Sequence, residues 1–333
     1  MISREKNSHL MQAIFKIHRI IIRYMSEFKI AILGCTGHVG KNLTYYFGKE
    51  QENFQLFLFT RHDTTYTSDN LTHFCELKNN FEVCNYNEFS DSNYDVVINC
   101  VGISDTAKIE SEGISILKLT EDIDSMILEN IQKNTNIKFI NFSSGAVYGE
   151  EIDSPIKDST LPKNSSNDIS SYASAKIESE SRHREQDKLN IIDLRLFSFF
   201  SRFMDLDSRF LISDIIRSIK QNKTLVTNEF NFFRDYIHPK DLFSFLKKCI
   251  DKNPINEAFD LYSKKPIAKF DLLKSLQDKY GLQYEITANS GFSSPTGFKK
   301  NYYSESRKAK LLGYEPEYSS LATIENEMTY FLH

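Results

Sequence analysis

The sequence has no tryptophan, only seven prolines and 12 glycines among 333 residues, and only five cysteines. The cysteines are scattered, odd in number and never spaced as CxxC. This pattern argues against a disulfide framework and against a zinc site, and it is typical of a reducing compartment. We therefore expect a cytoplasmic protein that binds no metal.

An excess of one charge and long apolar runs are also missing. The formal net charge is −4, and no basic stripe interleaved with aromatic residues indicates a nucleic-acid partner. The stretch Leu10–Ile22 contains Lys16, His18 and Arg19, and it is too short and too charged to span a bilayer. No small-residue cleavage site follows it. We expect residues 1–24 to be a dispensable N-terminal extension and leave them out of the predicted fold.

From Phe28 onward, short apolar runs alternate with segments of helical period, which predicts βαβ units and a parallel sheet. The runs expected to form strands are Lys29–Leu33, Phe54–Phe59, Asp95–Asn99, Lys138–Phe142 and Ile191–Leu196. The segments expected to form later helices are Arg202–Asn222, Lys240–Lys252 and Lys269–Tyr280. We predict an α/β fold with a doubly wound parallel (Rossmann) sheet over residues 25–200. A smaller mixed substrate-binding lobe over residues 201–333 could return one strand and one helix to this sheet.

Three glycines, Gly34, Gly37 and Gly40, directly follow the first predicted strand in the string GCTGHVG. Glycine permits a tight turn, lets backbone N–H groups approach a pyrophosphate, and lets the next helix pack closely on the strand. The string therefore predicts a dinucleotide-binding turn, although an ordinary glycine-rich connection is the alternative. The other residues of the turn that we assign to cofactor binding are Thr36, His38 and Val39.

The end of the second predicted strand reads Thr60–Arg61–His62–Asp63. Dinucleotide sites usually have an acidic residue here, about 20 residues after the glycines, to bind the adenosine ribose. No acid occupies the strand end itself, and Arg61 could bind a 2′-phosphate. This favours NADP. The alternative is a solvated Arg61 and an Asp63 that binds the ribose of NAD.

Tyr172 and Lys176 lie four residues apart in the string YASAK on a predicted helix, so their side chains project from one face. A phenol is a poor base at neutral pH, but a nearby ammonium stabilises the phenolate. Lys176 could also hold the ribose of the nicotinamide. Ser144 follows the predicted strand Lys138–Phe142 and is the candidate to bond the substrate oxygen. Together these residues predict hydride transfer between a nicotinamide cofactor and a carbon that bears oxygen.

Five strings occur in a characteristic order: GCTGHVG, SSGAVYG, YASAK, LRLFS and RDYIHPKDL. In this order they resemble the extended short-chain dehydrogenase/reductases, and in particular the NAD-dependent epimerase/dehydratase family that acts on nucleotide-activated sugars. The similarity extends from Phe28 to about Leu332. The resemblance implies a nucleotide-sugar substrate and assigns catalysis to Ser144, Tyr172 and Lys176.

The resemblance also implies binding residues outside the catalytic strings. Arg234 resembles the arginine that contacts the diphosphate of the sugar nucleotide, a role that suits a bidentate guanidinium. Its alternative is an ion pair with Asp235. The further residues assigned to cofactor binding are Cys100, Val101, Gly102, Tyr172 and Lys176, and those assigned to substrate binding are Ser144 and Ser198.

Departures from the family pattern reduce the number of reactions that the resemblance allows. Sugar 4,6-dehydratases have an Asp–Glu pair where this sequence has Gly145 and Ala146, and the fucose-synthase branch has a cysteine at the position of Ala146. Ser198 stands where many 4-epimerases have asparagine. With Arg61, these departures favour a 4-ketosugar reductase that uses NADPH. The alternatives are a 4-epimerase that retains NAD and a non-catalytic dinucleotide sensor.

The resemblance suggests a homodimer as well. The helix around Leu117–Ile131 and the helix after Tyr172 are the candidates for its four-helix interface. Their apolar stripes could equally belong to the core of a single chain.

Overall fold

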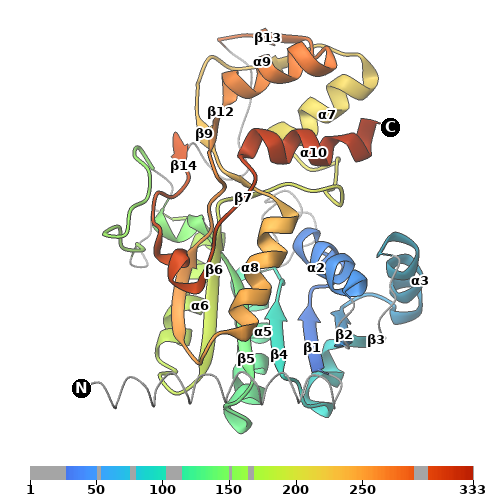
Figure 1. The fold of residues 1–333 in the computed structure, drawn as a ribbon, viewed down its shortest axis with the longest axis vertical. Coiled ribbons are helices and arrows are strands. Elements are labelled where there is room, and N and C mark those ends of the chain that lie inside the picture. Colours follow the sequence, from blue (N-terminus) through green and yellow to red (C-terminus); the bar gives the residue numbers. More distant parts are fainter. Residues whose placement is uncertain are drawn as a thin grey trace, which may run out of the picture.

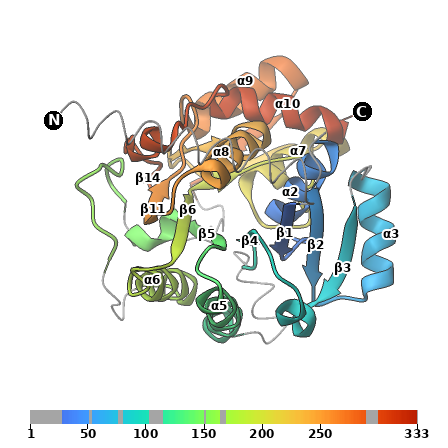
Figure 2. The same cartoon turned by 60° about the horizontal axis from the view of Figure 1, so that its bottom comes forward.

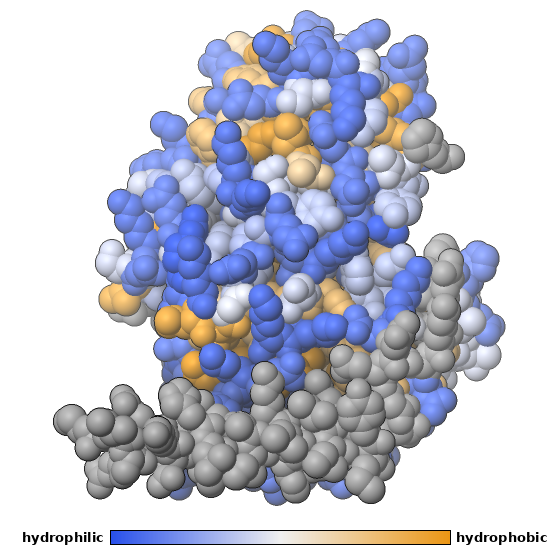
Figure 3. Space-filling model, in the orientation of Figure 1, coloured by the Kyte–Doolittle hydropathy of each residue, from blue (hydrophilic) through white to orange (hydrophobic). Residues whose placement is uncertain are grey.

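The computed structural model describes residues 28–50, 54–75, 80–102, 115–149, 152–163, 169–288 and 299–332. The expected N-terminal extension, residues 1–24, lies outside the described residues. Within the described ranges, no helix is long and apolar enough to cross a membrane. The face of the molecule seen in Figure 3 is mostly hydrophilic, with smaller hydrophobic patches.

A seven-stranded sheet with the order β11-β6-β5-β4-β1-β2-β3 forms the larger part of the molecule. All of its neighbouring strands run parallel. Its strands are β1 (Phe28–Leu33), β2 (Phe54–Thr60), β3 (Phe81–Asn85), β4 (Val96–Asn99), β5 (Lys138–Ser144), β6 (Asn190–Leu196) and β11 (Asn256–Asp260). The sheet confirms the predicted doubly wound Rossmann fold. Each of the five predicted strands coincides with one of these strands to within two residues, whereas β3 and β11 were not predicted.

Helices cover both faces of the sheet (Figure 2). The helices of this part are α2 (His38–Lys49), α3 (Thr64–Cys75), α5 (Ile116–Lys133), α6 (Ser171–Arg184) and α8 (Pro239–Asp251). Successive residues of a strand point to opposite faces, so Ile30 and Ile32 join one core with α2 and α8, while Ala31 and Leu33 join a second core with α5.

The apolar stripe of α5 is used within the chain. Ile123, Ile127 and Ile131 are buried in the core between α5 and the sheet. The intramolecular alternative thus accounts for this stripe, and the homodimer stays a prediction.

The C-terminal part forms a smaller lobe above the carboxyl ends of the strands (Figure 1). Its helices are α7 (Leu211–Gln221), α9 (Lys269–Tyr280) and α10 (Ser320–Leu332). Its short strands pair as β7 (Ser198–Phe199) with β10 (Tyr236–Ile237), β8 (Leu225–Thr227) with β13 (Tyr284–Ile286), and β9 (Phe233–Arg234) with both β12 (Ile267–Ala268) and β14 (Asn301–Tyr302). These small mixed sheets confirm the mixed character predicted for the lobe. Two elements that lie between lobe elements along the chain belong to the larger part of the molecule: α8 packs against the large sheet, and β11 pairs with β6.

One helix is shorter than predicted. The segment Arg202–Asn222 was expected to be helical throughout, but α7 begins only at Leu211. Before it, Asp205 accepts hydrogen bonds from the backbone N–H groups of Asp207 and Ser208, which forms turns instead. Aspartate and serine favour such local bonds over the helical pattern.

Candidate active site

The glycine turn, which we define as Gly34–Gly40, connects β1 to α2. Gly34 has a φ of +76°, and a Cβ atom there would lie 3.1 Å from the backbone of Cys100 and Val101. A Cβ atom on Gly40 would lie 2.1 Å from the Gly34 carbonyl oxygen. The N-cap of α2, Gly37, provides no side-chain acceptor for the first N–H groups of the helix. Such a turn fits a pyrophosphate, because a helix N-terminus presents unpaired N–H groups to an anion.

The other residues of the glycine turn differ in what they can offer a cofactor. Thr36 and Val39 are half-buried within it. The imidazole of His38 turns toward the lobe, where Nε2 lies 2.8 Å from the Ser201 hydroxyl. Burial, assisted by the charge of Lys41, lowers the pKa of His38 to about 4. The ring is therefore neutral at physiological pH and cannot attract a phosphate through a positive charge.

The segment after β4 lies between the glycine turn and α6. The backbone N–H of Cys100 donates to the Leu33 carbonyl at 2.9 Å, and that of Val101 donates to Asn99 Oδ1 at 3.0 Å. A Cβ atom on Gly102 would lie 3.6 Å from the Nζ atom of Lys176. The structure therefore brings Gly102 and Lys176, which are distant in sequence, to one place.

The serine end, which we define as Ser143–Ser144 at the end of β5, lies next to Lys176. Lys176 is 4% exposed, and its Nζ donates a hydrogen bond of 2.8 Å to the carbonyl of Phe142 on the same strand. Tyr172 is half-buried, one turn earlier on α6. Within the described chain, its hydroxyl bonds to neither Ser144 nor Lys176. The structure thus ties Lys176 to β5, the strand that ends in Ser144, and places Tyr172 on the same helix as Lys176.

The Ser144 hydroxyl has two protein partners. It accepts a hydrogen bond from the backbone N–H of Ala146, with an N–O distance of 3.2 Å. The hydroxyl of Tyr302, on β14 of the lobe, also lies 3.2 Å from it. Sequence reasoning missed Tyr302, because its neighbours contain no motif and 158 residues separate it from Ser144.

A buried polar network lies behind the serine end. Ser143 donates to Glu180 at 2.5 Å, and Glu180 in turn accepts from Arg195 Nη2 at 2.5 Å. Arg195 also donates to the Tyr148 hydroxyl at 2.7 Å, which donates to Asp260 at 2.9 Å. These contacts fasten β5, α6, β6 and β11 to one another beside the candidate catalytic residues.

The side chain of Phe197 occupies the space next to Gly145. A Cβ atom on Gly145 would lie 2.5 Å from ring atoms of Phe197. The ring packs against Tyr302, with 5.2 Å between centroids. Position 145 therefore has no room for an acidic side chain while Phe197 keeps this position.

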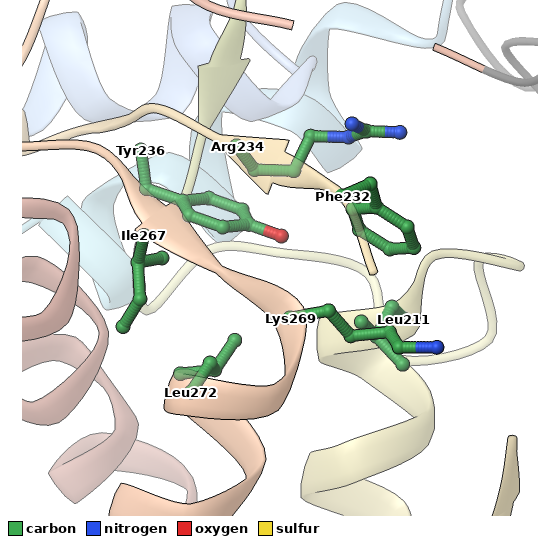
Figure 4. A pocket seen from close by; sticks show the side chains of 7 residues that line it. All are labelled: Leu211, Phe232, Arg234, Tyr236, Ile267, Lys269 and Leu272. Carbon is green, nitrogen blue, oxygen red and sulfur yellow. The ribbon is translucent and has the colours of Figure 1, made fainter. Parts of the chain in front are cut away.

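Arg234 lines a pocket of the lobe with Leu211, Phe232, Tyr236, Ile267, Lys269 and Leu272 (Figure 4). Its guanidinium donates to the carbonyls of Phe233 and Lys299, each at 2.8 Å. The alternative partner, Asp235, instead accepts from the Ser263 N–H at 3.0 Å and does not pair with Arg234 in the described structure. Another residue assigned to the substrate, Ser198, is half-buried on β7, where it pairs with Tyr236.

Lys269 is a second cation of this pocket, and sequence reasoning missed it. It is 2% exposed, and its Nζ donates to the carbonyl of Asn228 at 2.6 Å. No carboxylate of the described chain pairs with it, and burial lowers its pKa to about 8. In Figure 4 the Phe232 ring lies between the two cations, with its centroid 4.2 Å from the Arg234 guanidinium and 5.5 Å from Lys269 Nζ. Both cations donate to carbonyl oxygens, and neither pairs with a carboxylate of the described chain.

Two residues that follow β2, Arg61 and Asp63, are the candidates to bind the adenosine ribose or its 2′-phosphate. Arg61 is exposed at the strand end. The Asp63 carboxylate accepts the backbone N–H of Tyr66 at 2.8 Å, and the Asp63 carbonyl accepts that of Thr67 at 3.0 Å. Asp63 therefore caps the N-terminus of α3, a common function of aspartate.

Comparison with known proteins identifies the family of the chain. The model of the NAD dependent epimerase/dehydratase family matches residues 30–261. The chain belongs to this family. No curated protein matches the chain in sequence.

Solved structures of this family share the fold at low sequence identity. UDP-glucuronic acid 4-epimerase from Bacillus cereus, as a tyrosine-to-phenylalanine mutant with NAD and a fluorinated UDP-sugar, has a TM-score of 0.77 and 19% identity, and the match covers 91% of this chain and 99% of that one. dTDP-glucose 4,6-dehydratase from Bacillus anthracis with NAD has a TM-score of 0.73 and 16% identity, covering 91% and 96%. UDP-glucose 4-epimerase from Thermotoga maritima with UDP-glucose has a TM-score of 0.73 and 18% identity, covering 91% and 98%.

Proposed function

We propose that the protein is an NADPH-dependent reductase of nucleotide-activated 4-ketosugars. The observation that supports it most is the position of the Lys176 ammonium between the Phe142 carbonyl and Gly102. This position adjoins the segment after β4 along which the cofactor would lie. Ser144 ends β5, the strand to which Lys176 bonds, and Tyr172 lies one turn before Lys176 on α6.

In this proposal the nicotinamide, when bound, supplies the hydride that reduces the ketone carbon. Tyr172 donates its phenolic proton to the ketone oxygen as the hydride arrives. The Ser144 hydroxyl donates a hydrogen bond to the same oxygen and so stabilises the negative charge that develops there. The Lys176 ammonium stabilises the phenolate that remains on Tyr172 until a proton from solvent restores it.

Arg234 and Lys269 are the residues that we assign to the diphosphate of the substrate. Both lie beside the Phe232 ring, and neither has a carboxylate partner in the described chain. A diphosphate offers oxygens on two adjacent phosphorus atoms and could contact both cations. The family neighbours with bound UDP-sugars support this class of substrate.

Dehydration is disfavoured on steric grounds as well as chemical ones. The Phe197 ring occupies the space that an acidic side chain at position 145 would need, and Ala146 carries no ionisable group. Elimination of water from a sugar needs one group that removes a proton from carbon and another that protonates the leaving hydroxyl, whereas ketone reduction needs one proton, from Tyr172, besides the hydride of the cofactor.

NADP is favoured over NAD because Asp63 caps α3 and Arg61 lies at the strand end. An Arg61→Ala variant should bind NADPH at least about tenfold more weakly, since a charged hydrogen bond contributes roughly 1.5–3 kcal/mol, and it should bind NADH unchanged. Dissociation constants from fluorescence titration test this. An Arg61→Ala variant that keeps its NADPH affinity would leave NAD as the cofactor.

A 4-epimerase that retains NAD is the second candidate, because two of the family neighbours described above are 4-epimerases. Incubation with UDP-glucose and NAD, followed by separation of the sugar products, tests the epimerase. Loss of NADPH absorbance with dTDP- or UDP-linked 4-keto-6-deoxyglucose tests the reductase. Tight cofactor binding without turnover of either kind would indicate the sensor instead.

The role of Tyr172 has its own test. Tyr172→Phe should lower turnover at least about 100-fold, as expected when a general acid is lost, and should leave the NADPH dissociation constant unchanged. Tyr330→Phe, which removes the hydroxyl of a phenol that is 56% exposed, is the matched control and should keep full turnover. Turnover of Tyr172→Phe near that of the wild type would refute the assignment.

A further inference from the structure

We propose that Tyr302 is a positioning residue that directs the Ser144 hydroxyl toward the substrate oxygen. This inference rests on the proposed function, in which Ser144 bonds that oxygen. The evidence is the distance of 3.2 Å between the Tyr302 hydroxyl and Ser144 Oγ. Tyr302 touches no reacting atom in this proposal, so it acts only through Ser144.

The role of Tyr302 follows from the number of hydrogen bonds that the Ser144 hydroxyl can donate and accept. A serine hydroxyl has one proton to donate and two lone pairs that accept. The backbone N–H of Ala146 already donates to one lone pair of Ser144 at 3.2 Å. When Tyr302 donates to the other, both acceptor sites are filled and the Ser144 proton has no acceptor among these two neighbours. It is then directed to an oxygen that enters the site.

The surroundings of Tyr302 hold its hydroxyl in place. The side chain is 5% exposed, and its ring packs against Phe197 with 5.2 Å between centroids. In the small sheet of the lobe, Tyr302 on β14 pairs with Arg234 on β9. The Arg234 guanidinium lies 5.7 Å from the centre of the Tyr302 ring. The same strand pair therefore supports the proposed phosphate arginine and the partner of the proposed catalytic serine.

A double-mutant cycle tests the inference. Turnover of dTDP- and UDP-linked 4-keto-6-deoxyglucose with NADPH is measured for the wild type, Tyr302→Phe, Ser144→Ala and the double variant. Loss of one neutral hydrogen bond should lower kcat of Tyr302→Phe about fivefold and change KM less than about twofold. Ser144→Ala should lower kcat about 100-fold. Because Tyr302 acts through Ser144, the double variant should match Ser144→Ala within about twofold.

Tyr303→Phe is the matched control, since Tyr303 is the neighbouring tyrosine and its ring packs against Phe233. Its kcat should equal that of the wild type. A Tyr302→Phe variant with wild-type or higher kcat overturns the inference, and so does a fivefold loss that persists in the Ser144→Ala background. Full turnover by Ser144→Ala overturns the role of Ser144 in the proposed function. Absence of wild-type turnover with both probes overturns the proposed function and this inference with it.

Discussion

The glycine turn and the serine end lie at the same edge of one sheet, but different interactions fix their geometry. The glycine turn is held by backbone: Gly34 N–H donates to the Phe59 carbonyl at 3.1 Å, and Gly37 N–H donates to the Gly34 carbonyl at 3.0 Å. The serine end is held by side chains, through the buried pair of Glu180 and Arg195. A pyrophosphate site needs close backbone approach, whereas a proton-transfer site needs a few side chains held in fixed directions.

A second buried network joins α6, the helix that carries Lys176, to β6 and α5. His183, near the end of α6, lies 2.9 Å from Asp193 of β6 and 3.1 Å from Asp124 of α5. Burial by itself would lower the pKa of His183, but the charge of Asp193 and the hydrogen bonds to both aspartates raise it to about 9. The helix that presents Tyr172 and Lys176 is therefore fixed by buried polar contacts at Lys176 itself and at His183 near its C-terminal end.

The largest expected effect comes from breaking the network at the serine end. Arg195→Met should lower the free energy of unfolding by about 3–5 kcal/mol, because it leaves the Glu180 carboxylate buried without its cation. Urea denaturation measures this loss. Asp122→Asn, which breaks the exposed pair with Lys118, is the control and should cost less than about 0.5 kcal/mol. Equal losses in the two variants would show that the network does not hold the serine end.

The next effect is a pH dependence from His183. Its pKa is raised from 6.5 to about 9, so the stabilisation is complete below pH 6.5 and is lost as the pH rises toward 9. The free energy of unfolding should fall by at most roughly 3 kcal/mol over this range. His183→Gln should remove most of this dependence, and His73→Gln, at an exposed histidine, should retain it. A wild type whose stability is constant over this range would contradict the charged state of His183.

The smallest effect concerns the backbone of the glycine turn. Gly34 and Gly281 have similar φ values, +76° and +70°, but a Cβ atom at Gly281 meets nothing within 4 Å. Gly281→Ala should therefore cost about 1 kcal/mol, from the left-handed conformation alone. Gly34→Ala should cost about 1 kcal/mol more and should also weaken NADPH binding, because its Cβ presses on the backbone after β4. Equal losses of stability with unchanged NADPH affinity would show that the turn tolerates a side chain.

The apolar pattern of the sequence predicted some elements of the fold and missed others. Strands β1, β2 and β5 were predictable because continuous apolar runs reflect burial on both faces of a sheet. The strands that were missed, β3 and β11, have the sequences FEVCN and NEAFD, in which polar residues interrupt the apolar pattern. The helix predicted to start at Arg202 failed because turn-forming residues precede Leu211.

The sequence by itself determined five of the seven strands of the large sheet, the glycine turn and the shared helix of Tyr172 and Lys176. Each of these depends on residues that are close along the chain, where steric limits and side-chain periodicity act directly. Only the tertiary structure decided that Tyr302 meets Ser144, that Lys269 joins Arg234, and that Asp63 caps α3. For the first two, the reason is that packing of the lobe onto the sheet joins segments far apart in sequence. The partner of Asp63, the backbone N–H of Tyr66, is close in sequence. An aspartate can form several different local hydrogen bonds, however, and only the folded structure shows which one Asp63 forms.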